Sequence, residues 1–138
     1  MKKIIGSIFK KNPPPTFQDQ SLGKLVYDSD LWTGKLKNDV YFFVAGNPER
    51  PDPLLLNSLK DLSKIFDETN MNALSYIKEQ LEPHQEIDIT DFTNYAVDFI
   101  WNDHPELFAL EYTMKDDLDG IWRVEFKNGI PVSIGRDD

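Results

Sequence analysis

The sequence predicts an α+β fold: an antiparallel sheet made of a β-meander, a two-helix hairpin and a second β-meander, with the helices packed on one face. Three observations predict it. Short runs of aromatic and β-branched residues alternate with polar turns over residues 22–46. Leucines with three- and four-residue spacing follow over residues 55–66. Alternating apolar residues then return over residues 108–134.

The first meander is expected to contain three strands. Apolar residues cluster at 22–27, 31–36 and 40–45, and short polar segments separate these clusters. The third cluster is almost entirely apolar, which is typical of a strand in the middle of a sheet. Three prolines within residues 46–53 then end this part of the sheet.

Two helices are expected next. The first covers the leucine-rich segment 55–66, and the second begins near Asn70 and ends before Pro83. Their apolar residues would cover one face of the sheet as a helical hairpin.

The segment 88–102 has two possible structures. Phe92, Tyr95 and Phe99 have helical spacing, whereas Tyr95, Val97 and Trp101 alternate as in a strand. We favour a strand from about Tyr95, because its neighbours are typical of strands and a turn-like segment follows.

The carboxyl-terminal part is expected to be a second meander. Its strands are 108–114, 121–126 and 131–134, and the turn Lys127-Asn-Gly129 joins the last two. Asn-Gly is a strong signal for a β-hairpin.

The chain divides into a basic leader with a proline spacer, residues 1–16, and a single α+β domain, residues 17–138. Pro13-Pro-Pro15 cannot continue a helix, so the boundary is expected there. The helical face of the leader is compatible with weak peripheral membrane contact by residues 1–12, or with packing on the domain. Its apolar residues are Ile4, Ile5, Ile8 and Phe9. No segment approaches the ~20 apolar residues of a transmembrane helix.

Composition limits the class of partner. The chain has 15 basic and 24 acidic residues, a net charge of −9, and four of the lysines lie in the first twelve residues. This excess of acid opposes DNA or RNA as a partner, because phosphate binding depends on lysine and arginine. The absence of cysteine removes disulfides, thiolate metal sites and cysteine nucleophiles. The expected location is cytoplasmic.

Neither a cofactor, a metal site nor a catalytic group is predicted. His84 and His104 lie singly in expected loops, so we interpret them as surface residues. Residues 116–120 resemble part of a calcium loop, but Lys115 and Phe126 occupy the first and last ligand positions. Serines and glycines form neither a nucleophile elbow nor a phosphate-binding loop. No spacing singles out a catalytic carboxylate pair. The chain is therefore expected not to be an enzyme.

Acidic residues in turns and one tryptophan are the candidate partner-binding residues. Trp101 and Trp122 are expected in the core, whereas core packing and partner contact are equally open for Trp32. The candidates for partner binding are Asp28, Asp30, Trp32, Asp116, Asp117 and Asp119.

Several segments resemble a known kind of protein family. They are the lysine-rich start, the proline spacer, Leu22-Gly-Lys-Leu-Val-Tyr-Asp28, Trp32-Thr-Gly-Lys-Leu36 and the region 119–132. Together they resemble small bacterial families of unknown function, in which a basic leader precedes a meander, a helical hairpin and a second meander. The first hairpin, with Asp30-Leu-Trp32, is shorter than in that pattern. Members of such families resemble immunity proteins, which neutralise polymorphic or secreted toxins by binding them, and the resemblance implies no catalytic residues.

The expected function is therefore non-enzymatic protein binding, as in an immunity-like protein that neutralises a basic bacterial toxin through an acidic surface. Opposite potentials on the two proteins would speed their association. The alternative is a small hydrolase or ligand-binding domain whose carboxylates converge in a pocket. A third hypothesis is an adaptor localised by its basic amino-terminal helix.

Overall fold

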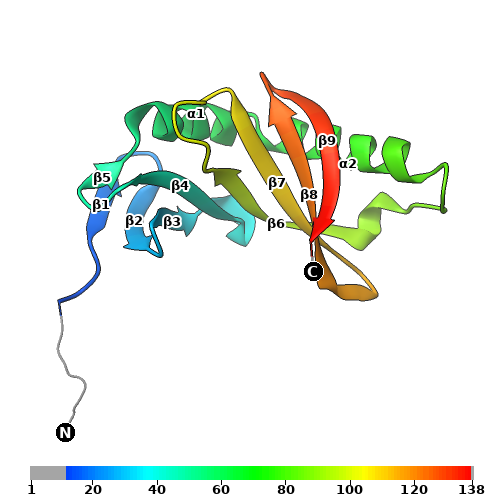
Figure 1. Ribbon diagram of the computed structural model, residues 1–138, viewed down its shortest axis with the longest axis horizontal. Helices are drawn as coiled ribbons and strands as arrows, with labels where there is room; N and C mark the ends of the chain where they lie inside the picture. The colour runs from blue at the N-terminus through cyan, green and yellow to red at the C-terminus, as the bar shows by residue number, and fades with distance from the viewer. Residues whose placement is uncertain (1–11, 138) are drawn as a thin grey trace, which may run out of the picture.

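The computed structural model describes residues 12–137, which contain nine β-strands and two α-helices (Figure 1). The membrane-contact hypothesis for the leader rests on residues that lie almost entirely outside this range. In chain order the elements are β1 Thr16–Asp19, β2 Gly23–Asp28, β3 Leu31–Lys35, β4 Tyr41–Asn47, β5 Arg50–Pro51, α1 Pro53–Lys64, α2 Phe66–Leu81, β6 Phe92–Phe99, β7 Leu107–Met114, β8 Asp117–Lys127 and β9 Ile130–Asp137.

All nine strands belong to one sheet, in which β1-β2-β3-β4-β6-β7-β8-β9 are successive neighbours and β5 pairs with β4. The predicted α+β class with a mostly antiparallel sheet is confirmed. One pair differs from the prediction: β4 and β6 are parallel, with Tyr41 opposite Ala96 and Val44 opposite Phe99. Residues 48–91 form the crossover that brings the chain back in the same direction, as a parallel pair requires.

The two helices follow one another along the sheet. Asp52 caps α1 by accepting hydrogen bonds from the N–H groups of Leu54 and Leu55, at 2.9 and 3.1 Å. Only Ile65 separates α1 from α2, and Figure 1 shows the helices nearly end to end behind the sheet. The expected hairpin, with a second helix from Asn70, is therefore wrong, because one residue is too short to reverse the chain between helices.

Several strand boundaries also differ from the prediction, among them the start of β8, which lies at Asp117 and not at Ile121. β1 begins at Thr16, so the sheet already includes the last residue assigned to the spacer. The ambiguous segment is a strand, but it begins at Phe92 and contains a bulge between Asn94 and Ala96. The extra residue, Tyr95, shifts the alternation of side chains between the two faces, which explains the mixed helical and strand spacing.

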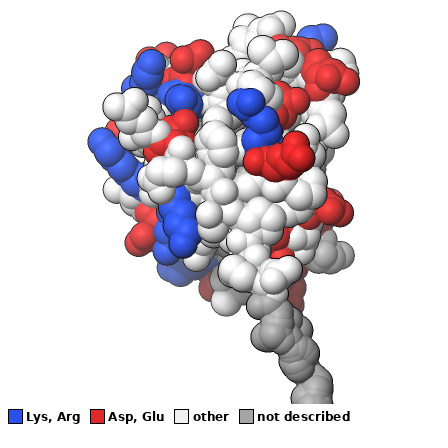
Figure 2. Space-filling view, turned by 90° about the vertical axis from the view of Figure 1, so that its left-hand side faces the viewer, with Lys and Arg blue, Asp and Glu red and all other residues white. Residues whose placement is uncertain are grey.

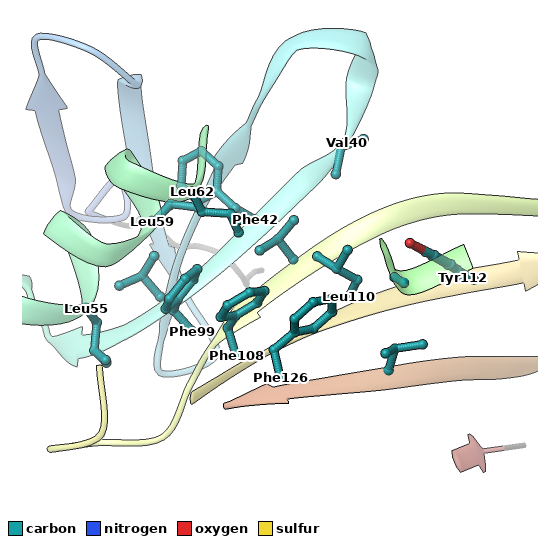
Figure 3. Packing of buried hydrophobic residues seen from close by; sticks show 14 of the residues in the cluster. Val40, Phe42, Leu55, Leu59, Leu62, Phe99, Phe108, Leu110, Tyr112 and Phe126 are labelled. Atoms are coloured by element: carbon teal, nitrogen blue, oxygen red, sulfur yellow. The ribbon is translucent and has the colours of Figure 1, made fainter. Parts of the chain in front are cut away.

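The core lies between the helices and one face of the sheet. Leu55, Leu59 and Leu62 of α1 belong to the same buried cluster as the aromatic side chains of the central strands (Figure 3). Phe108 stacks between Phe99 and Phe126, with ring centroids 5.1 and 4.6 Å apart. Alternate side chains of these strands point to the opposite face, which no helix of the described chain covers (Figure 1). We call it the open face.

A glycine opposite an aromatic ring gives a first test of this packing. Gly34 pairs with Phe42 across β3 and β4, and a Cβ at Gly34 would lie 2.5 Å from Cζ of the buried ring. We expect Gly34→Ala to lower the free energy of unfolding by about 1–3 kcal/mol, since Phe42 has no free space to move into. The matched control is Gly135→Ala in β9, where a Cβ meets nothing within 4 Å. Equal urea midpoints for the two variants would contradict this packing.

Candidate functional site

The predicted acidic residues lie at opposite ends of the sheet. Asp28 and Asp30 flank the β2–β3 turn, which lies beside the end of β4, because Leu31 pairs with Ala45. The β7–β8 turn lies beyond the start of β6, because Met114 pairs with Phe92. Since β4 and β6 run parallel, these turns are a strand length apart. The two groups of aspartates therefore do not form one surface.

Trp32 does not fit a partner-binding role, and its assignment as a candidate contact residue is corrected. Its side chain is 0% exposed and its indole N–H donates a 2.9 Å hydrogen bond to the backbone oxygen of Asn47. The indole also packs against the rings of Phe17 and Tyr27. It is buried because it pairs with Val44 on the core face of the sheet.

The other two tryptophans differ in their surroundings. Trp122 is half-buried against the core, where its ring meets Phe92 edge-on. Trp101 is half-buried just after the end of β6.

Asp117 is held within the protein. Its carboxylate accepts hydrogen bonds of 2.9 and 2.7 Å from the guanidinium of Arg136 and one of 3.2 Å from the indole N–H of Trp122. The hydrogen bonds from Arg136 lower the pKa of Asp117. A Cβ on Gly120 would lie 2.5 Å from this guanidinium, so the glycine lets Arg136 reach across β8. Asp117 therefore fixes the hairpin and has little capacity left for a partner.

The tip of the β7–β8 hairpin exposes a large apolar side chain that was not among the predicted contact residues. Leu118 is 79% exposed and stands between Asp117 and Asp119. Asp116 adopts a left-handed φ of 68°, which forms the turn. Leu118 is the second residue of β8, and in the sequence it stands out as a single leucine among the acidic residues of 116–119.

Excess negative charge gathers around this hairpin. Lys115 N–H donates a 2.9 Å hydrogen bond to the backbone oxygen of Asp91, which joins the hairpin to the segment after α2. Residues 78–91 and 115–119, which we call the acidic end, carry eight acidic residues against two lysines. Figure 1 shows residues 78–91 at the right and the β7–β8 hairpin below them, at the lower edge of the molecule. At the opposite end, near β1 and β2, acidic and basic side chains are interspersed around a broad uncharged band (Figure 2).

A second cluster of charged groups lies on the open face. Asp98 on β6 is only 3% exposed, and Glu111 on β7 and Arg123 on β8 lie beside it. Tyr95 donates a 2.7 Å hydrogen bond from its hydroxyl to Oε1 of Glu111. Arg123 donates one of 2.7 Å to Oδ2 of Asp137 on β9. Four neighbouring strands therefore contribute to one polar cluster, which we call the Arg123 cluster.

The two carboxyl groups of the Arg123 cluster have opposite pKa shifts. Burial, followed by hydrogen bonding to Glu111, raises the pKa of Asp98 to about 9. Burial alone would raise the pKa of Glu111, but hydrogen bonds from Asp98 and Tyr95 and the charge of Arg123 outweigh it and lower the pKa. Burial and Glu111 together raise the pKa of Tyr95. At neutral pH the cluster therefore contains a neutral Asp98 beside an ionised Glu111.

The alternative hypothesis anticipated converging carboxylates, but the sequence did not identify these residues. Asp98, Glu111 and Arg123 are 12 or more residues apart, and only the β6–β7–β8 register brings them together. The available signal was a single aspartate inside the apolar run 96–100. Because Asp98 is almost fully buried, a substrate has no access to it. The ion pairs and hydrogen bonds of the Arg123 cluster instead connect neighbouring strands of the sheet.

A cavity of about 750 Å³ lies elsewhere in the structure. It separates the β1–β2 turn and the β3–β4 connection from the junction of the helices. Its wall combines apolar residues with lysines and acids, namely Leu22, Leu36, Ile65, Phe66, Lys35, Lys37, Lys64, Asp67 and Glu68. Neither Asp98 nor Glu111 lines it.

No three His, Asp or Glu side chains within residues 12–137 are grouped to hold a metal ion. His104 instead contacts Oε2 of Glu106 at 3.2 Å on the surface. Neither described helix has the length and hydropathy to cross a bilayer.

Comparison of the chain with protein-family models, curated proteins and solved structures finds no match. The resemblance to immunity-like families of unknown function therefore stays a prediction.

Proposed function

We propose that this chain is a non-enzymatic protein-binding domain that recognises a basic partner protein through the tip of the β7–β8 hairpin. The observation that carries the proposal is Leu118, a large apolar side chain 79% exposed among aspartates at the acidic end. Exposure of an isolated leucine costs the free protein little, but its burial in a partner would be favourable by about 1.5–3 kcal/mol.

The surroundings of Leu118 match the usual anatomy of a binding site. An apolar anchor with a charged rim is the arrangement in which few residues supply most of the binding energy. Asp116 and Asp119 are exposed and form such a rim. The ion pair of Asp117 with Arg136 holds the hairpin in shape, which reduces the entropy lost on binding.

The partner proposed for this surface is a bacterial toxin with a basic face, as the sequence resemblance implies. A negative surface attracts such a face over long range and raises the association rate, with a strong dependence on ionic strength. An immunity-like protein needs no chemistry beyond binding and covering its target. The alternative of a hydrolase gains no support from the carboxyl pair, since Asp98 is almost completely buried.

Leu118→Ala tests the proposal with the protein encoded next to this chain's gene. Binding of the purified pair is measured by titration calorimetry, and we expect the variant to weaken it about tenfold or more, as for an interface anchor. The control Leu54→Ala changes a leucine of α1 that is 60% exposed and far from the hairpin, and its affinity should equal the wild type's.

Two further measurements make this test decisive. Asp116→Asn with Asp119→Asn should slow association more than it speeds dissociation, and added salt should remove the difference. If the wild type shows no complex at micromolar concentration, or if Leu118→Ala and Leu54→Ala bind equally, the proposal is wrong.

A further inference from the structure

Arg123 stands at the centre of three carboxyl groups from three different strands. Its Nη1 lies 2.7 Å from Oδ2 of Asp137, its Nη2 lies 3.7 Å from Oε2 of Glu111, and its Nε lies 3.8 Å from Oδ2 of Asp98. Only the contact with Asp137 has the length of a hydrogen bond. The guanidinium of Arg123 therefore hydrogen-bonds to Asp137 on the edge strand β9. It lies slightly too far from Asp98 on β6 to form a hydrogen bond with it.

Two buried atoms of this cluster have no hydrogen-bond partner. They are Oδ2 of Asp98 and Nε of Arg123, which face each other across the 3.8 Å gap. A neutral Asp98 tolerates this gap, whereas a buried carboxylate without a donor is costly. Closing the gap by about 1 Å would satisfy both atoms with one charge-assisted hydrogen bond.

We propose that Arg123 is a partner-exchange switch: when Asp98 releases its proton to solvent, the guanidinium moves from Asp137 to Asp98 and frees the end of β9. The charged and titratable groups around this movement are Tyr95 on β6, Glu111 on β7, Glu125 on β8 and Asp137 on β9. On β4 the residue opposite Asp98 is Phe43, which provides no competing charge. Arg123 is the only cation that contacts Asp98 among the described residues.

The freed end of β9 includes the residue that fixes the hairpin. Arg136 precedes Asp137 and holds Asp117, so loosening of this end reaches the hairpin tip. The effect on partner binding rests on the function proposed above, but the exchange itself takes place in the free protein. Measurements on the free protein therefore test the exchange whether or not the hairpin binds a partner.

Carboxyl ¹³C NMR of the wild-type protein over pH 3–10.5 tests the exchange directly. We expect the Asp98 carboxyl to titrate in the alkaline range, consistent with its raised pKa. We also expect the Asp137 carboxyl signal to shift with the same midpoint, as its hydrogen bond from Arg123 is lost. Amide protection at the end of β9 should fall about two- to fivefold, the fold-change expected for loss of one exposed ion pair.

Two variants separate the exchange from general alkaline loosening. Asp98→Asn keeps the shape and stays neutral, so the Asp137 signal should no longer move above pH 7. Glu125→Gln removes a carboxylate that Arg123 does not contact and should leave the Asp137 shift in place. The proposal is overturned if wild-type Asp98 titrates in the ordinary acidic range, if the Asp137 signal is constant, or if Asp98→Asn retains the shift; the first two outcomes need no variant.

Discussion

Replacing Phe108 with alanine is expected to lower the free energy of unfolding by about 3–5 kcal/mol, the usual cost of removing a buried phenylalanine. Phe108 stacks between Phe99 and Phe126 (Figure 3), in the buried cluster that also contains the leucines of α1. Both stacked neighbours lose a ring contact when Phe108 is removed. The close packing around the cavity lets it collapse only in part.

Urea unfolding followed by circular dichroism measures this effect. Leu118→Ala is the matched control, because it also removes a large apolar side chain but from a position that is 79% exposed. Its midpoint should lie within about 0.5 kcal/mol of the wild type's. A loss below about 1 kcal/mol for Phe108→Ala would contradict the stacked core, since even modest cavities in cores cost more.

Asp98→Asn is expected to raise the free energy of unfolding near pH 8, because the folded wild type must hold a proton on Asp98 that the unfolded chain has lost, and each pKa unit of that difference corresponds to about 1.4 kcal/mol. Asparagine keeps the size of the side chain. Its amide N–H₂ can donate to Glu111 as the protonated Asp98 does. The variant also removes the need to keep a proton on a buried carboxyl at a pH where the unfolded chain has lost it.

The gain should depend on pH in a defined direction. The pKa of Asp98 is raised from 3.8 to about 9 in the folded protein, so folding takes up a proton between these values. Wild-type stability contributed by Asp98 is therefore present at acidic pH and is lost as the pH rises through this window. Asp98→Asn lacks this pH dependence. The unfolding free energies of the wild type and of Asp98→Asn should therefore be closest near pH 4, and the variant should become increasingly more stable than the wild type toward pH 8–9. A difference that stays constant over this range would show that Asp98 is not protonated in the folded state.

Local patterns were sufficient to predict the fold class. The apolar run of β4, the alternation in β7 and β8 and the leucine spacing of α1 depend only on neighbours in the sequence. The parallel contact between β4 and β6 depends instead on the length and course of residues 48–91. The break at Ile65 was also missed, because the apolar spacing of α1 continues through Phe66 with no Gly or Pro to mark an end.

The candidate site was less predictable than the fold. Aspartates in turns were visible in the sequence, but the partner of Asp117 lies 19 residues away on β9. Whether Trp32 faces the core or solvent depends on which face of the sheet the helices cover, and alternation alone does not specify that face. The strand that carries Asp98 was predicted, but the bulge at Tyr95 shifts its alternation, so the face on which Asp98 lies was not.

The single parallel pair has a consequence for how the chain folds. Strands β1–β4 and strands β6–β9 each form from consecutive segments, whereas β4 and β6 meet only after residues 48–91 have been ordered. Loop closure makes such distant pairings slow. During synthesis the first four strands emerge early, and β4 then presents an unpaired, aromatic-rich edge until the second half of the chain arrives. The nascent chain is most prone to aggregation while this edge of β4 is unpaired. Pairing of β6 with β4 removes the exposed edge.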